Sequence, residues 1–127
     1  MPDLGIVVDE VEFPVEQGKL REFAHATGAA DGNGMPLTFT AVAGHWRDQA
    51  AMVKLLGLDL RRIVVGGAEW EYHAPIRAGD RLRGQRVLVA REQKKEMTLF
   101  TLETRFHRQD GELAVIQRDT VIELPRR

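Results

Sequence analysis

Histidine and carboxylate side chains are the groups in this chain that could move protons, because the sequence contains no cysteine to act as a thiolate nucleophile. The four histidines are His25, His45, His73 and His107. Asp48 lies three residues after His45, so on a helix its carboxylate could orient the imidazole. No two histidines have the spacing of metal ligands, and we therefore expect no metal site.

A second candidate for proton transfer is the loop AADGNGMP, residues 29–36. Its carboxylate, Asp31, is the best acid available there, and Asn33 is its closest polar neighbour. Asp-Gly-Asn-Gly is also an ordinary turn sequence, and the residues alone favour the turn. His45 has a similar alternative, because a histidine on a mostly apolar helix is often packed at a subunit interface.

Two helices and an extended segment precede the rest of the chain. In IVVDEVEFPVEQGKL, Val11, Phe13 and Val15 alternate with polar residues, which is typical of a strand. VEQGKLREFAHATG has helical spacing. A longer helix is predicted from Thr38 or Thr40 to about Leu56, closed by Gly57. At about 1.5 Å per residue, this helix would be roughly 25 to 30 Å long.

From residue 62 onward every segment has the pattern of a strand. The four predicted strands are RIVVGGAEWEYHAP, DRLRGQRVLVARE, EMTLFTLETRFHR and ELAVIQRDTVIEL. Gly66 and Gly67 predict a bulge or a close approach, and QDGE predicts a hairpin turn. This order of elements predicts an α+β protein, a single domain over residues 1–127, with an antiparallel sheet curled round one long central helix.

Charge and hydropathy exclude several classes of function. The formal net charge is −1, from 18 basic and 19 acidic residues that are interspersed, so we expect no nucleic-acid or anionic-membrane partner. No apolar run approaches the roughly 20 residues that span a bilayer, and the N-terminus does not resemble a signal peptide. We expect a soluble, cytoplasmic protein.

The stretch Trp70 to Leu82 carries the most specific pattern. WEYHAP followed by RAGD resembles the strand and turn of the MaoC-like (R)-specific hydratases and dehydratases, in particular their non-catalytic-type N-terminal dehydratase domain. GKLREFAHATG, PLTF, LLGLDLRRIVVGG and QDGELA resemble further segments of that family, in the same order. The similarity covers nearly the whole chain from about residue 13 and implies the hot-dog fold, a sheet wrapped around a central helix.

The resemblance implies a reaction as well. It is the (R)-specific addition of water to a trans-2-enoyl thioester of coenzyme A or acyl carrier protein, or the reverse dehydration, with no metal or redox cofactor. Catalytic members carry Asp-x-Asn-Pro-x-His before the central helix. Here Asp31 and Asn33 match the first half, but Gly34 replaces the proline, and Met35 or Leu37 stands where histidine is needed. The motif is degenerate.

Five residues are expected to contact the substrate, at the wall or rim of an acyl tunnel: Trp46, Tyr72, His73, Arg77 and Gly79. Each has a structural alternative. Trp46 has the spacing of a core residue, His73 could be structural or at an interface, and Gly79-Asp80 has the form of a tight turn. Arg77, like Arg81, Arg83 and Arg86, could contact the phosphates of coenzyme A or be an ordinary surface arginine.

Two hypotheses of function follow. In the first, the chain is the tunnel-forming half of a hydratase or dehydratase, active only with a partner subunit that supplies the catalytic histidine. A lone hot-dog leaves a sheet edge open, so a homodimer or a heterodimer with a second hot-dog subunit is expected. In the second, the chain is a homodimeric acyl-thioester-binding protein, or a thioesterase that uses His45 or Asp31, although no thioesterase motif is visible.

Overall fold

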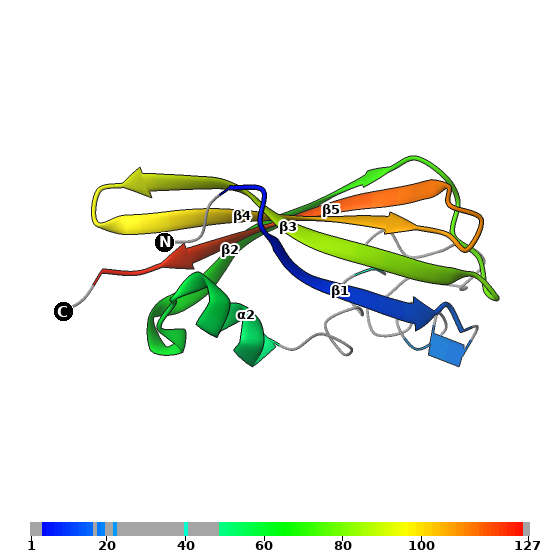
Figure 1. Ribbon diagram of the computed structural model, residues 1–127, viewed down its shortest axis with the longest axis horizontal. Helices are drawn as coiled ribbons and strands as arrows, with labels where there is room; N and C mark the ends of the chain where they lie inside the picture. The colour runs from blue at the N-terminus through cyan, green and yellow to red at the C-terminus, as the bar shows by residue number, and fades with distance from the viewer. Residues whose placement is uncertain (1–3, 17, 20–21, 23–39, 41–48, 126–127) are drawn as a thin grey trace.

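The chain folds into one twisted antiparallel sheet with a helix against one face (Figure 1). The computed structural model describes residues 4–16, 18–19, 22, 40 and 49–125. The elements are β1 (Val7–Pro14), α2 (Gln49–Leu56), the short 3-10 helix η2 (Leu60–Arg62), β2 (Ile63–Tyr72), β3 (Arg81–Lys94), β4 (Met97–His107) and β5 (Leu113–Glu123). The sheet order is β1-β3-β4-β5-β2, so β1 and β2 are its edges. The predicted antiparallel sheet is confirmed.

Alternation along the strands separates an inner face of the sheet from an outer one. The inward positions form two apolar clusters. The turn-side cluster contains Val11, Phe13, Val15, Ile76, Leu82, Phe106, Ala114 and Val115. The helix-side cluster contains Met52, Leu56, Leu88, Phe100, Leu102 and Val121. The predicted alternation in β1 and β4 is therefore confirmed, because burial of these apolar side chains fixes which face of each strand turns inward.

Helix α2 is the described part of the predicted central helix, whose earlier residues, Thr40 apart, lie outside the described residues. It ends where the sequence predicts, at Gly57, which has a φ of +68°. The Gly57 amide donates to the Lys54 carbonyl at 3.2 Å and the Leu58 amide to the Val53 carbonyl at 3.0 Å, the two bonds of a Schellman motif. Among the described residues, no helix has the length and apolar character needed to cross a membrane.

Two glycines of the sheet permit close packing or irregular pairing. The register between β2 and β5 shifts between Val65 and Gly67, which confirms the bulge predicted there. Gly84 lies on the inner face of β3, under Phe106, whose ring meets that of Phe13 edge-on at a centroid distance of 6.1 Å. A Cβ atom at position 84 would lie 2.7 Å from the Phe106 ring and 2.8 Å from the Thr104 methyl.

Replacing Gly84 by alanine is therefore expected to destabilise the fold by about 1–3 kcal/mol, because the buried Phe106 ring has to move out of a close-packed position. The change is measured as the free energy of unfolding in urea. Gly67→Ala is the matched control, since a Cβ there meets nothing within 4 Å. Equal stability of the two variants would contradict this account of Gly84.

Candidate functional site

A row of polar side chains crosses the inner face of the sheet between the two apolar clusters. It takes one residue from each strand, each paired in register with the next: Asp9, Arg86, Thr104, Gln117 and Trp70. Arg86, Thr104 and Gln117 are buried. We call these five residues the polar row. Polar groups in such a place must find partners within the protein, because leaving one unpaired costs several kcal/mol.

At the β1 end of the polar row, a buried ion pair joins Arg86 to Asp9. The guanidinium donates from Nε to Oδ1 at 3.0 Å and from Nη2 to Oδ2 at 2.5 Å, a bidentate geometry. The Arg86 side chain is 5% exposed, so the expectation that it is a surface arginine available to phosphates is wrong. The protein can bury the positive charge of Arg86 because the carboxylate of Asp9, a residue distant in sequence, neutralises it.

At the other end of the polar row, hydrogen bonds connect the sheet to Thr40. The Trp70 indole Nε1 donates to the Thr40 hydroxyl at 2.7 Å, and that hydroxyl donates to Gln117 Oε1 at 2.7 Å. The Gln117 amide nitrogen then donates to both carboxylate oxygens of Asp119, at 3.2 Å each. Thr40 is fully buried, so these hydrogen bonds attach that residue to β2 and β5 across the inner face.

The structure places some of the predicted site residues and does not describe others. Asp31, Asn33, His45 and Trp46 lie outside the described residues. Tyr72 is half-buried against the turn-side cluster, and burial raises its pKa to about 12.

The predicted His73 lies on the face opposite Tyr72, where its imidazole hydrogen-bonds the Glu71 carboxylate. That contact, with Arg118, lowers the pKa of Glu71.

The remaining two predicted residues, Arg77 and Gly79, belong to a turn centred on Asp80. One Asp80 oxygen accepts from the Arg77 backbone amide at 2.8 Å, which confirms the predicted tight turn. The other accepts from Gln109 at 3.2 Å and Arg108 at 3.4 Å, contacts between distant segments that the sequence did not predict. Backbone bonds from Val15 to Asp80 and from Gly79 to Val15 attach the same turn to the end of β1.

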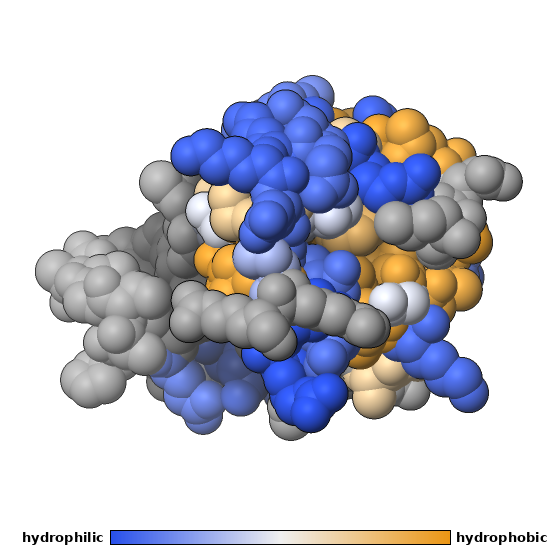
Figure 2. All heavy atoms as spheres, turned by 90° about the vertical axis from the view of Figure 1, so that its left-hand side faces the viewer, coloured by the Kyte–Doolittle hydropathy of each residue, from blue (hydrophilic) through white to orange (hydrophobic). Residues whose placement is uncertain are grey.

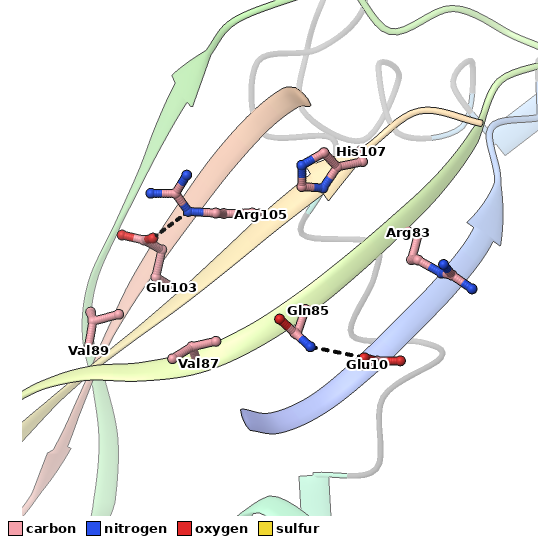
Figure 3. Close-up of a pocket in the computed structure, with 8 residues that line it drawn as sticks. All are labelled: Glu10, Arg83, Gln85, Val87, Val89, Glu103, Arg105 and His107. Carbon is pink, nitrogen blue, oxygen red and sulfur yellow. Dashed lines mark hydrogen bonds and ion pairs between the residues drawn. The ribbon is translucent and has the colours of Figure 1, made fainter. Parts of the chain in front are cut away.

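The outer face carries an open hollow of about 430 Å³, lined by residues of β1, β3 and β4 (Figure 3). Within it Gln85 donates to Glu10 at 3.0 Å, and Arg105 pairs with Glu103 at 3.0 Å. Of the predicted substrate contacts that the structure describes, none lines this hollow, whereas Arg83, named above as a possible contact for the phosphates of coenzyme A, does. It lies on the face opposite the polar row, and its paired charges are those of a solvated surface.

Among the described residues, no group of three or more histidine, aspartate or glutamate side chains could hold a metal ion. The described part of the inner face offers hydroxyl, amide, indole and carboxylate groups, which can hold a ligand by hydrogen bonds. Sequence reasoning missed Gln117 and Asp119. The signal was present, since Val115, Gln117, Asp119 and Val121 alternate in β5 and so share one face.

Residues 3–117 match the model of a protein family described as the FAS1-like, dehydratase domain region. No curated protein matches the sequence significantly. Among solved structures, the C-terminally truncated HadBC (3R-hydroxyacyl-ACP dehydratase) complex from Mycobacterium tuberculosis aligns with a TM-score of 0.74 and 22% identity, covering 96% of this chain and 98% of that one.

Two further solved structures are similar. A MaoC-like dehydratase aligns with a TM-score of 0.77 and 23% identity over 96% of this chain, which spans only 42% of that protein. The (R)-hydratase from A. caviae involved in PHA biosynthesis aligns with a TM-score of 0.62 and 21% identity, over 98% of each chain. At these identities the likeness shows the fold, which is the hot-dog fold that the sequence resemblance implied.

Replacing Asp80 by alanine is expected to lower the free energy of unfolding by about 2–4 kcal/mol at pH 7, because the Arg77 amide, Gln109 and Arg108 lose their shared acceptor. Burial alone would raise the pKa of Asp80, but these donors outweigh it and lower the pKa below its usual 3.8.

A depressed pKa means that the Asp80 contribution is present above pH 3.8 and lost as the pH falls through the folded-state pKa. The stability difference between wild type and Asp80→Ala should therefore narrow in acid, as followed by urea unfolding between pH 7 and pH 3. Asp110→Asn, at an exposed turn carboxylate that accepts one backbone bond, is the control. A pH-independent difference would contradict the assignment.

Proposed function

The chain belongs to the FAS1-like dehydratase domain family, and on that basis we propose that it is a subunit of an (R)-specific enoyl-thioester hydratase or 3-hydroxyacyl-thioester dehydratase. The observation that carries the proposal is the family match over residues 3–117. The names of the similar structures, a 3R-hydroxyacyl-ACP dehydratase complex and an (R)-hydratase, support the same reaction. The substrate is an acyl thioester of coenzyme A or acyl carrier protein, and the cytoplasmic location expected from the sequence belongs to the same proposal.

In this reaction a base and an acid act at the two carbons next to a thioester carbonyl, while hydrogen-bond donors stabilise the charge that develops on its oxygen. Asp31 and Asn33 supply half of the family's loop motif, and no histidine follows them within it. We therefore assign this chain the tunnel-forming role and assign the catalytic histidine to a partner. His45 is the alternative base within the chain. Trp46, Tyr72, His73, Arg77 and Gly79 are the proposed substrate contacts.

A partner can be accommodated at the open edge of the sheet. In the sheet that the structure describes, β2 has a neighbour on one side only, and most of its residues are exposed. Val65 is 73% and Val64 44% exposed. Figure 2 shows apolar surface gathered on the side of the molecule where β2 begins. An exposed apolar edge strand of ten residues is a surface that proteins normally cover. HadBC is itself a complex, which supports pairing with a second hot-dog subunit.

We expect the purified chain to bind a medium-chain acyl-CoA but not to hydrate trans-2-enoyl-CoA, because the loop motif lacks its histidine. Binding is measured by calorimetry and turnover by loss of enoyl absorbance. His45→Ala and Asp31→Asn should leave acyl-CoA binding within about twofold. Adding a hot-dog subunit with an intact Asp-x-Asn-Pro-x-His motif should restore turnover.

The opposite result has a definite meaning. If the chain alone turns over enoyl-CoA and His45→Ala lowers the rate several hundredfold with the fold preserved, then His45 is catalytic and the tunnel-forming role is wrong. Release of free coenzyme A from acyl-CoA would favour the thioesterase alternative. Failure of the folded chain to bind any acyl-CoA would reject the proposed substrate class.

The pairing surface has its own test. Val65→Lys places a charge on the exposed apolar start of β2. In the proposed dimer, formed with a second copy or with a second hot-dog subunit, this change should raise the dissociation constant at least about tenfold, because an interface core disfavours charge. Sedimentation velocity over a range of concentrations measures the effect. Val89→Lys, on the hollow of the outer face, is the control and should leave association unchanged. A dimer unaffected by Val65→Lys would show that β2 is not the pairing edge.

A further inference from the structure

At the β2 end of the polar row each residue donates a hydrogen bond to the next, and the last acceptor is Asp119. Trp70 donates to Thr40, Thr40 donates to Gln117 Oε1, and the Gln117 amide nitrogen donates to the carboxylate. The orientation of the Gln117 amide is set by Asp119, because a carboxylate only accepts and therefore faces the amide nitrogen, which leaves the amide oxygen to accept from Thr40. Each donor in the series polarises the next, so the arrangement supports negative charge at its final acceptor.

Asp119 itself is poorly compensated. A carboxylate has about four acceptor positions. Of the residues that the structure describes, one amide group donates to Asp119, through two long bonds of 3.2 Å. Among the described residues no cation pairs with it, in contrast to Asp9 at the other end of the polar row, which holds Arg86 in a bidentate pair. A half-buried carboxylate without a cation costs free energy, which points to a role other than stability.

The surroundings of Asp119 are open on the side of β2. Its register partner there is Ala68, and Gly67 precedes it, so no large side chain of that strand covers the inner face at this level. Both residues are exposed, and a Cβ atom built on Gly67 would meet nothing within 4 Å. The carboxylate is thus next to the edge that a second subunit would cover, at the border between the two apolar clusters.

We propose that Asp119 contacts the substrate and accepts a hydrogen bond from the hydroxyl group of a 3-hydroxyacyl thioester. This inference rests on the proposed function. The 3-hydroxyl is the group of the acyl part that carries a donor hydrogen, and the water that adds to the enoyl form carries one as well. Asp119 can accept from either, because no described residue other than Gln117 donates to it. Asp119 would thus distinguish the hydroxylated thioester from the saturated one.

The test compares two ligands that differ by one hydroxyl, (R)-3-hydroxyhexanoyl-CoA and hexanoyl-CoA, by calorimetry on the full chain. Wild type is expected to bind the hydroxylated ligand about tenfold more tightly, as a charge-assisted hydrogen bond would give. In Asp119→Asn the side-chain oxygen can still accept from Gln117, but the charge is lost. The preference should therefore fall to within about twofold, with hexanoyl-CoA affinity nearly unchanged.

Glu69→Gln is the matched control, because it removes the same charge from an exposed side chain on β2, at the residue next to Ala68. It should retain the tenfold preference. A wild-type chain that binds both ligands equally, or an Asp119→Asn chain that keeps the preference, would overturn the role of Asp119 while leaving the proposed function standing. A wild-type chain that binds neither ligand would reject the proposed function itself. Equal binding of the two ligands by the wild-type chain would overturn the role even if the variant fails to fold.

Discussion

Burial of the polar row is the constraint on which the rest of the inner face depends. Polar side chains from all five strands lie between two apolar clusters, and each must meet its partner at one register only. A slip of one residue in any strand would turn its member of the row outward and its apolar neighbours with it. Among the described residues the one buried side-chain polar atom without a partner is Arg108 Nε, which lies outside the row. The polar row therefore helps to specify the register in which the five strands pair.

The two ends of the polar row differ in how their carboxylates are neutralised. Asp9 and Arg86 neutralise each other in a bidentate pair. At the β2 end the donors are neutral groups, and within the described part of the chain Gln117 alone donates to their last acceptor, Asp119, near an exposed strand edge. The Asp9–Arg86 end of the polar row is therefore structural, and the Asp119 end is the candidate site. Its position near the edge strand β2 is consistent with the proposed second subunit.

Local patterns in the sequence predicted the strands and the end of the helix. The features that the sequence did not predict depend on contacts between residues that are distant in sequence. The alternation in β1 and β4, the glycine that ends α2 and the bulge at Gly66-Gly67 follow from neighbouring residues. The burial of Arg86 depends on Asp9, and the second set of donors to Asp80 comes from the β4–β5 turn. No local pattern contains those pairings. Of the predicted site residues, those in the loop and the early central helix lie outside the described residues and stay predictions.

The contacts within the polar row join residues that are far apart in sequence, and this separation affects the order in which the chain folds. Strands β3, β4 and β5 follow one another as hairpins, whereas the Asp9–Arg86 and Thr40–Gln117 contacts each join residues 77 positions apart. Closing loops of that length costs chain entropy before the contact forms, so the β3–β4–β5 hairpins can assemble early while β1 and Thr40 dock late. Until β1 docks, part of the inner face of the sheet is exposed to water, and a nascent chain would spend that interval with apolar side chains open to contact with other chains.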